Sequence, residues 1–253
     1  MCCPSELQRI HWTAGSALTE HLTIVHILPG LLGSYGDVGN VLVLRHRAQS
    51  RGIKVTIVDI DPGEQVPASA DLYVIGGGQG DEQTCAAELL RADTGLPDAF
   101  QRGAPILAVC AGMQLLGEWF TDGGGNKVAG LGLLDLVTSC LRVRAVGDVL
   151  AEATAIPNMP TLIGFENHLG ATLLGSTSEP FSRVRKGVGN GAGEPVDGVM
   201  QGAVIGTYLH GPVLALNPAL ADHLLANVVG TLPPIDDSRA ENFRTSRLAR
   251  AAW

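Results

Sequence analysis

The sequence predicts an α/β protein with a three-layer α/β/α arrangement around an open, mostly parallel, flavodoxin-like sheet. Two observations support this fold class. Short apolar runs alternate with longer segments of helical pattern from residue 21 onward, and this alternation is typical of doubly wound sheets. The run Pro105–Val109 is apolar throughout, which indicates a strand covered on both faces. Functional sites in such folds lie beyond the carboxyl ends of the strands.

The first half of the chain carries a regular alternation of strands and helices. Asp37 stands where its side chain can cap the first helix, and Val41, Leu44 and Ala48 share one face of that helix. Three glycines, Gly76–Gly78, directly follow the third strand. The expected strands are 21–28, 53–60, 72–75 and 105–109, and the expected helices are 38–50, 81–102 with an interruption near 95–97, and 113–120.

After Phe120 the pattern changes to β-rich segments separated by glycine-rich loops. Gly123–Gly132 holds five glycines and predicts a loop, and Gly187–Gly198 predicts a mobile hairpin tip. We expect one domain over 21–235, a flexible arm at 1–20, and a C-terminal helix at 236–253 that packs on the domain or extends from it. Within this domain, further strands are expected in 133–154, 161–168 and 203–209, and a helix at 217–229; the closing helix is expected over 236–252.

Composition excludes several classes of function. The 17 Lys and Arg residues against 25 Asp and Glu give a net charge of −8, which argues against a nucleic-acid-binding surface. No apolar run is long enough to cross a membrane, and the first residues lack a signal-peptide pattern, so we expect a cytoplasmic protein. The five cysteines form no Cys-x-x-Cys pair, so neither a metal site nor a disulfide framework is expected.

Cys110 is the candidate nucleophile. It ends the apolar strand and is followed by Ala111, Gly112 and a helical run. A nucleophile on a sharp strand-to-helix turn projects above the sheet, and small neighbours permit that turn. The following helix favours a thiolate, and the amide of Ala111 is placed to meet a developing oxyanion. The simpler interpretation is a buried cysteine that only packs.

A cysteine nucleophile needs a base, which is usually histidine. His210 ends a strand in Gly206-Thr-Tyr-Leu-His-Gly-Pro212 and ranks first, and His168 ranks second. Position 212 is proline, so no acid follows the histidine two residues later. Either the site works as a Cys–His dyad, or an acid such as Glu166 reaches it from elsewhere.

The glycine loop Gly76–Gly78 has three interpretations. A phosphate cradle is disfavoured because the Lys-Ser/Thr of a P-loop and the full dinucleotide spacing are missing. An ordinary turn is the common interpretation in isolation. The third is an oxyanion donor, with the amide of Gly77 or Gly78 acting beside that of Ala111.

These motifs together resemble a class I glutamine amidotransferase over residues 21–230. In the usual elbow of that class, Gly-x-Cys-x-Gly-x-Gln, Ala108 replaces the first glycine and Gln114 is the last residue. The usual His-x-Glu becomes His210-Gly-Pro212, as in the branch that contains the cobyric acid synthase glutaminase domains. Four motifs are most similar to the glutaminase subunits (GatD) of lipid II isoglutaminyl synthases: Tyr35-Gly-Asp-Val-Gly-Asn40, Gly76-Gly-Gly-Gln79, Gly164-Phe-Glu-Asn-His168 and Gly206–Pro212.

The resemblance implies hydrolysis of L-glutamine and transfer of ammonia to a Mur-ligase-like partner subunit (MurT). The partner would use ATP and Mg²⁺ to amidate D-isoglutamate of lipid II, so the resemblance implies no cofactor for this chain. The complex would reach lipid II at the inner face of the membrane. The family's substrate-binding arginine lies in Arg-x-x-Gly-Asp, here Arg144–Asp148, and Arg142 on the same strand face is the rival. A guanidinium pairs bidentately with a carboxylate. Gln114 and His168 are further substrate-binding candidates.

Three other functions remain open. The chain could serve another synthetase, such as one that amidates a corrinoid. It could be a non-catalytic glutamine- or peptide-binding regulator on the same fold, since no acid beside His210 is visible. It could also be a cysteine hydrolase acting on a small amide other than glutamine. The product made with each acceptor, and the labelling of Cys110 by a glutamine analogue, would separate these functions.

Overall fold

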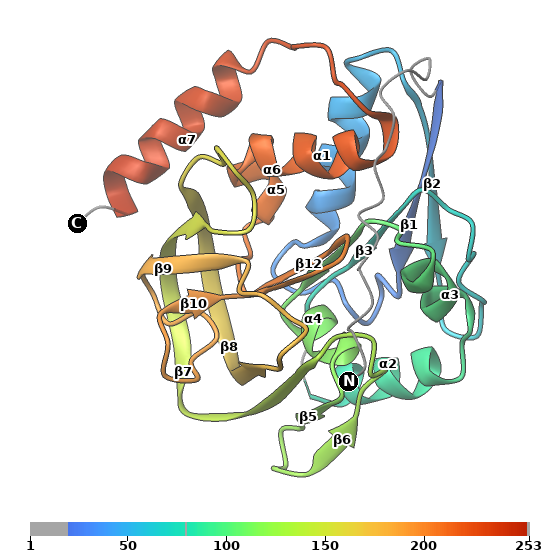
Figure 1. Ribbon diagram of the computed structural model, residues 1–253, viewed down its shortest axis with the longest axis vertical. Helices are drawn as coiled ribbons and strands as arrows, with labels where there is room; N and C mark the ends of the chain where they lie inside the picture. Colours follow the sequence, from blue (N-terminus) through green and yellow to red (C-terminus); the bar gives the residue numbers. More distant parts are fainter. Residues whose placement is uncertain (1–19, 79, 252–253) are drawn as a thin grey trace, which may run out of the picture.

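The computed structural model describes residues 20–78 and 80–251 (Figure 1). The expected arm at 1–20 lies outside the described residues, apart from its last residue. The first sheet has the strand order β11-β12-β4-β3-β1-β2. All of its pairings are parallel except β11 with β12, and the parallel part has flavodoxin-like order. The fold class is therefore confirmed. The strands are β1 His21–Ile27, β2 Lys54–Ile60, β3 Leu72–Ile75, β4 Ile106–Val109, β11 Val199–Gln201 and β12 Val204–Thr207.

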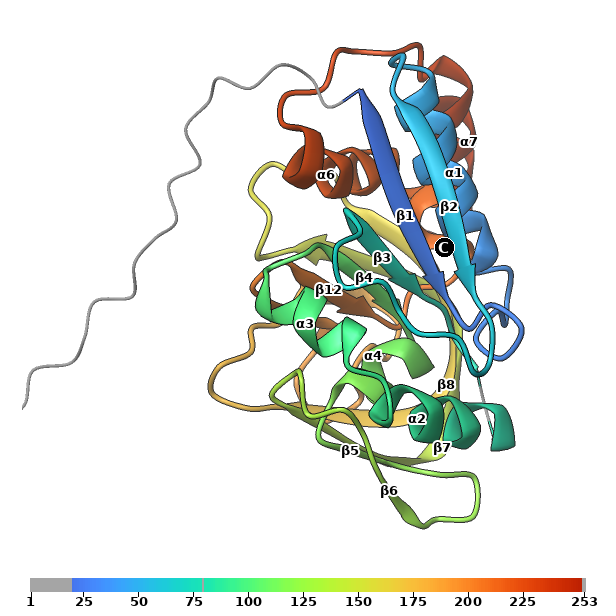
Figure 2. The ribbon, with the colours of Figure 1, turned by 90° about the vertical axis from the view of Figure 1, so that its right-hand side faces the viewer.

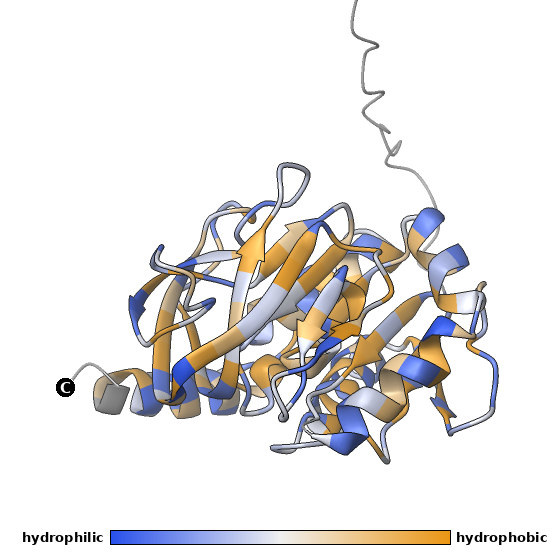
Figure 3. Cartoon of the chain, turned by 90° about the horizontal axis from the view of Figure 1, so that it is seen from below, coloured by the Kyte–Doolittle hydropathy of each residue, from blue (hydrophilic) through white to orange (hydrophobic). Residues whose placement is uncertain are grey.

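Helices cover both faces of this sheet (Figure 2). On one face α1 packs against β1 and β2 and also contacts α5 and α6, and on the other α4 packs against β4 and β12. The expected face of α1, with Val41, Leu44 and Ala48, is buried. Apolar residues dominate the strands, whereas the helices alternate apolar and polar bands (Figure 3). The helices are α1 Val38–Gln49, α2 Asp81–Arg91, α3 Gly95–Gln101, α4 Ala111–Leu116, α5 Val213–Leu216, α6 Pro218–Val229 and α7 Ser238–Ala251.

A second sheet follows α4 in the chain. Its order is β10-β9-β7-β5-β6, and β8 pairs antiparallel with β7. The register of that pair jumps, because Cys140 opposes Gly170 while Ala145 opposes His168. Residues 141–144 therefore bulge out opposite Leu169, and strand alternation does not apply to them. The strands are β5 Trp119–Thr121, β6 Lys127–Ala129, β7 Leu136–Ala153, β8 Leu162–Leu174, β9 Ser182–Lys186 and β10 Val196–Asp197.

Four local expectations were wrong. The loop expected over 123–132 contains the short strand β6, which pairs antiparallel with β5. The helix expected over 113–120 ends at Leu116, and the chain turns into β5 three residues later. The strand expected over 161–168 continues to Leu174, because β7 offers it a partner over that length. The segment 187–198 is no free hairpin tip, since Asn190 within it is buried and its carboxamide bonds both backbone groups of Gly198.

The C-terminal helix α7 is attached by buried arginines. Arg47 of α1 makes paired 2.7 Å hydrogen bonds to Asp222 of α6 and to Asp237, which directly precedes α7. Arg244 of α7 donates to the carbonyl of Leu216 and to Oδ1 of Asn217, each at 2.9 Å. Within the described part of the chain, no helix is both long and apolar enough to cross a membrane.

Candidate active site

Cys110 occupies the turn between β4 and α4, as the sequence indicates. Its φ of 52° is left-handed, which is strained for a residue with a Cβ atom. Its amide donates to the carbonyl of Thr207 on β12 at 2.8 Å, and only 6 % of the residue is exposed. A Cβ atom on Gly112 would lie 2.8 Å from both Cγ2 and O of Ile75, so the turn requires glycine there. The geometry is that of a nucleophile elbow.

His210 is oriented by Asp37, whose role as the acid could not be identified from the sequence. Its Nδ1 lies 3.0 Å from Oδ2 and 3.1 Å from Oδ1 of Asp37, and both side chains are buried. The backbone of His210 is fixed by two hydrogen bonds with Phe165 of β8. Asp37 stands at the N-cap of α1, yet its side chain makes no capping hydrogen bond. The expected capping role was therefore wrong, and the carboxylate faces the base instead.

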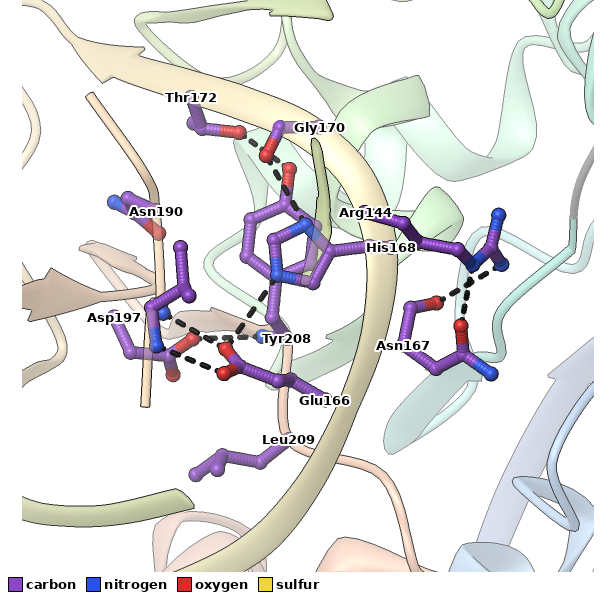
Figure 4. Close-up of polar contacts among 12 residues, drawn as sticks. Arg144, Glu166, Asn167, His168, Gly170, Thr172, Asn190, Asp197, Tyr208 and Leu209 are labelled. Atoms are coloured by element: carbon purple, nitrogen blue, oxygen red, sulfur yellow. Dashed lines mark hydrogen bonds and ion pairs between the residues drawn. The ribbon is translucent and has the colours of Figure 1, made fainter. Parts of the chain in front are cut away.

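Glu166 does not orient His210. Its Oε1 accepts a hydrogen bond from the amide of Val188 at 2.8 Å, and its Oε2 accepts one from the amide of Gly189 at 2.9 Å. The histidine near it is His168, whose Nε2 lies 3.7 Å from Oε2. Glu166 and His168 lie on one side of β8 and Asn167 on the other (Figure 4). The suggestion of Glu166 as the acid is thus corrected in favour of Asp37.

The surroundings of His210 favour its protonated form. Burial lowers its pKa, but the hydrogen bond with Asp37 and the neighbouring Cys110 outweigh burial and raise the pKa to about 10. Within the described residues Nε2 has no hydrogen-bond partner, so this nitrogen is available for proton transfer. The protonated ring can therefore exchange a proton with the nucleophile or with a bound substrate.

Gly77 lies where the three side chains converge. A Cβ atom there would lie 2.8 Å from Cε1 of His210, 3.1 Å from Oδ2 of Asp37 and 3.5 Å from Cβ of Cys110. Its amide donates to Oδ2 of Asp37 at 2.8 Å. The expectation that Gly77 supplies an oxyanion donor is therefore wrong, because its N–H is already engaged. Gly78 lines the pocket beside Cys110 and remains a candidate donor with Ala111.

A cavity of about 300 Å³ opens beside Cys110. Gln114, His168 and Arg144 line it, whereas Arg142 is exposed on the bulge and is not part of the lining. Nε of Arg144 donates to Oδ1 of Asn167 at 2.5 Å (Figure 4). The same guanidinium reaches the hydroxyl of Tyr35 at 3.2 Å. The bulge thus separates the two rival arginines, and of the two it is Arg144 that lines this cavity.

The floor of the cavity is a buried polar network. The ring of His168 stacks on Tyr208 with centroids 3.7 Å apart, and its Nδ1 lies 3.0 Å from the carbonyl of Gly170. Gln114 donates to the hydroxyl of Tyr208 at 2.9 Å and accepts from Gln83 at 2.6 Å. Both ends of the Gln114 carboxamide are therefore engaged, which fixes its position beside the nucleophile.

A buried carboxylate secures the strand end that carries the base. Asp197 accepts hydrogen bonds from Oγ1 of Thr207 at 2.5 Å and from the amide of Tyr208 at 3.0 Å. Thr207 Oγ1 in turn accepts from the amide of Leu209. These contacts fix the backbone directly before His210. Burial raises the pKa of Asp197 to about 6, although both hydrogen bonds oppose the rise.

Comparison with known proteins gives the family of this chain. The model of the CobB/CobQ-like glutamine amidotransferase domain matches residues 23–218. The chain is 37% identical over 208 residues to the subunit GatD of lipid II isoglutaminyl synthase (glutamine-hydrolyzing) from Staphylococcus aureus, covering 81% of this chain and 84% of that protein. It is 34% identical over 180 residues to a cobyric acid synthase from Sphingopyxis alaskensis, covering 69% of this chain but only 35% of that protein.

A solved structure shares the fold. The glutaminase domain of Trypanosoma brucei CTPS with bound acivicin superposes with a TM-score of 0.52 at 12% identity. The match covers 85% of this chain and 96% of that domain. At this identity the likeness concerns the fold alone.

Proposed function

Because this chain belongs to the CobB/CobQ-like glutamine amidotransferase family, we propose that it is the glutaminase subunit of a lipid II isoglutaminyl synthase. The observation that carries the proposal is the convergence of Cys110, His210 and Asp37 around Gly77, at the carboxyl ends of the central strands. The extent of the match to the GatD relative supports the acceptor, since 84% of that protein is covered.

The reaction begins when the Cys110 thiolate attacks the side-chain carboxamide carbon of L-glutamine. The carbonyl oxygen becomes an oxyanion held by the amides of Ala111 and Gly78. The His210 imidazolium donates a proton to the amide nitrogen, so the C–N bond breaks. Ammonia departs, and a thioester between Cys110 and the substrate remains. Water then attacks the thioester while His210 accepts its proton, and the C–S bond breaks to release glutamate. Asp37 positions His210 and balances its charge.

Arg144 anchors the substrate in this proposal. It lines the cavity that also contains Cys110, and its guanidinium is oriented by Asn167. A guanidinium in this position can pair with the α-carboxylate of glutamine, which places the carboxamide toward the thiol. Gln114 and His168 shape the cavity floor beneath the substrate.

The ammonia would be used by a separate Mur-ligase-like subunit. The relative's name describes a subunit of a synthase, and the P-loop motif with its lysine is missing from this sequence. ATP and Mg²⁺ would bind the partner, which activates the carboxylate of D-isoglutamate in lipid II. The complex would act at the inner face of the membrane without insertion of this chain.

Labelling of Cys110 tests the glutaminase activity. Acivicin should modify wild-type protein at Cys110, as located by peptide mass spectrometry, and excess L-glutamine should protect it. Cys110→Ser should lose both labelling and glutamine hydrolysis, whereas Cys85→Ser, an exposed cysteine outside the cavity, should keep them. Wild-type rates in Cys110→Ser would refute the assignment.

The acceptor is tested with the partner present. The chain co-expressed with a Mur-ligase-like subunit should copurify with it and convert lipid II and ATP to the amidated product with L-glutamine as nitrogen donor. The rival acceptor, a corrinoid carboxylate, is disfavoured because the cobyric acid synthase relative is covered over only 35% of its length. Amidation of the corrinoid but not of lipid II would favour that rival.

A further inference from the structure

Tyr35 has an unusual conformation at the mouth of the cavity. Its φ is 58°, a left-handed conformation that is costly for a residue with a Cβ atom. Two backbone hydrogen bonds hold the loop. The amide of Ser34 donates to the carbonyl of Gly77 at 2.9 Å, and the amide of Asp37 donates to the carbonyl of Ser34 at 3.3 Å. The surrounding contacts therefore impose the position of Tyr35, which points to a functional constraint.

Tyr35 contacts both ends of the site. Its ring meets the ring of His210 edge-on, with centroids 4.9 Å apart and an interplanar angle of 63°. Its hydroxyl accepts a hydrogen bond from Nη2 of Arg144 at 3.2 Å. The residue is still 41% exposed and lines the cavity, so a ligand can reach it. One side chain thus connects the base to the substrate anchor.

We propose that Tyr35 is a specificity-determining residue that binds the α-carboxylate of glutamine together with Arg144. The hydroxyl oxygen already accepts from Arg144, so its own proton is available for an acceptor in the cavity. A carboxylate beside Arg144 is the acceptor that such a donor pair fits. Because the ring also packs against His210, the carboxylate is held at a fixed distance from the base. This inference rests on the glutaminase function proposed above.

The test compares two substrates that differ only in the carboxylate. L-Glutamine and 4-aminobutanamide carry the same carboxamide, but the second lacks the α-carboxylate. Tyr35→Phe keeps the ring on His210 and removes only the hydroxyl. We expect the ratio of kcat/KM for L-glutamine to kcat/KM for 4-aminobutanamide to fall about tenfold, the effect of losing one hydrogen bond to a charged group. The loss should lie in KM, with kcat for L-glutamine nearly retained.

Binding to an inactive protein gives a second measurement. In a Cys110→Ala background, Tyr35→Phe should weaken L-glutamine binding about tenfold by isothermal titration calorimetry. Val38→Ala, an exposed residue three positions away, is the matched control and should leave the ratio and the binding unchanged. Circular dichroism and thermal unfolding check that the variants are folded.

Two outcomes would overturn the inference. An equal fall for both substrates would show that Tyr35 acts through His210 or through folding, and an unchanged ratio would show that its hydroxyl does not meet the carboxylate. Failure of the proposed function looks different, because wild-type protein would then hydrolyse neither substrate and Cys110 would not be labelled.

Discussion

The carboxylate of Asp37 lies 3.0 Å from Nδ1 of His210, although 173 residues separate the two in the chain. Asp37→Asn should lower kcat by about 10³- to 10⁴-fold with little change in KM. The neutral carboxamide that replaces the carboxylate would neither fix the reactive tautomer of His210 nor balance the positive charge of its imidazolium. Steady-state ammonia release measures this effect. Glu166→Gln is the matched control, since Glu166 contacts loop amides and not His210; an equal loss of kcat in the control would restore Glu166 as the acid.

The raised pKa of His210 predicts the alkaline limit of activity. The imidazolium must donate the proton that leaves with ammonia, and its pKa in the free protein is about 10. The value of kcat/KM should therefore decline only as pH approaches about 10, because this parameter reports the free enzyme. Protein held at each pH and assayed at neutral pH controls for inactivation. A decline centred near pH 7 would show that the free enzyme holds a neutral imidazole.

Gly77 should tolerate no side chain. A Cβ atom 2.8 Å from Cε1 of His210 must displace the imidazole, so Gly77→Ala should reduce kcat at least about 100-fold. Gly30→Ala is the control, because a Cβ atom there meets nothing within 4 Å. Thermal unfolding of both variants separates a displaced base from an unfolded protein. Near-normal turnover by Gly77→Ala would mean that the loop can move away at small cost.

Asp197 should make stability depend on pH in the acid range. Its folded pKa of about 6 lies above the ordinary value of 3.8 for an aspartate, so its stabilising contribution is present below about pH 4 and is lost as pH rises through about 6. The free energy of unfolding of Asp197→Asn, relative to wild type, should therefore rise over this range by on the order of 3 kcal/mol. Urea unfolding between pH 4 and 7 measures it. Asp61→Asn, an exposed carboxylate, should show no such trend.

Much of the first sheet could be predicted because its signals are local. Buried parallel strands are apolar throughout, and the turns that follow them carry glycine or small residues, so the positions of Cys110 and His210 at strand ends follow from short stretches of sequence. Asp37 could not be found in this way. Its place before a helix equally fits a capping residue, and only the fold brings it to His210. The motif around Tyr35 was visible, but its role needed spatial neighbours.

The second sheet was harder to predict for a physical reason. Its long antiparallel pair contains a bulge, and strand alternation fails across it, so Arg142 and Arg144 could not be distinguished. The loop 187–198 looked mobile from its glycines. In the structure its amides satisfy the buried carboxylate of Glu166, a pairing that no local pattern reveals.

The distance along the chain between the acid and the base has a consequence during protein synthesis. A ribosome releases residue 37 long before residue 210, and domains form as the chain emerges. A nascent chain that has folded β1 to β4 already displays its thiol, yet it lacks the histidine that completes the site. A chain that ends before residue 210 therefore lacks the base that the proposed reaction requires.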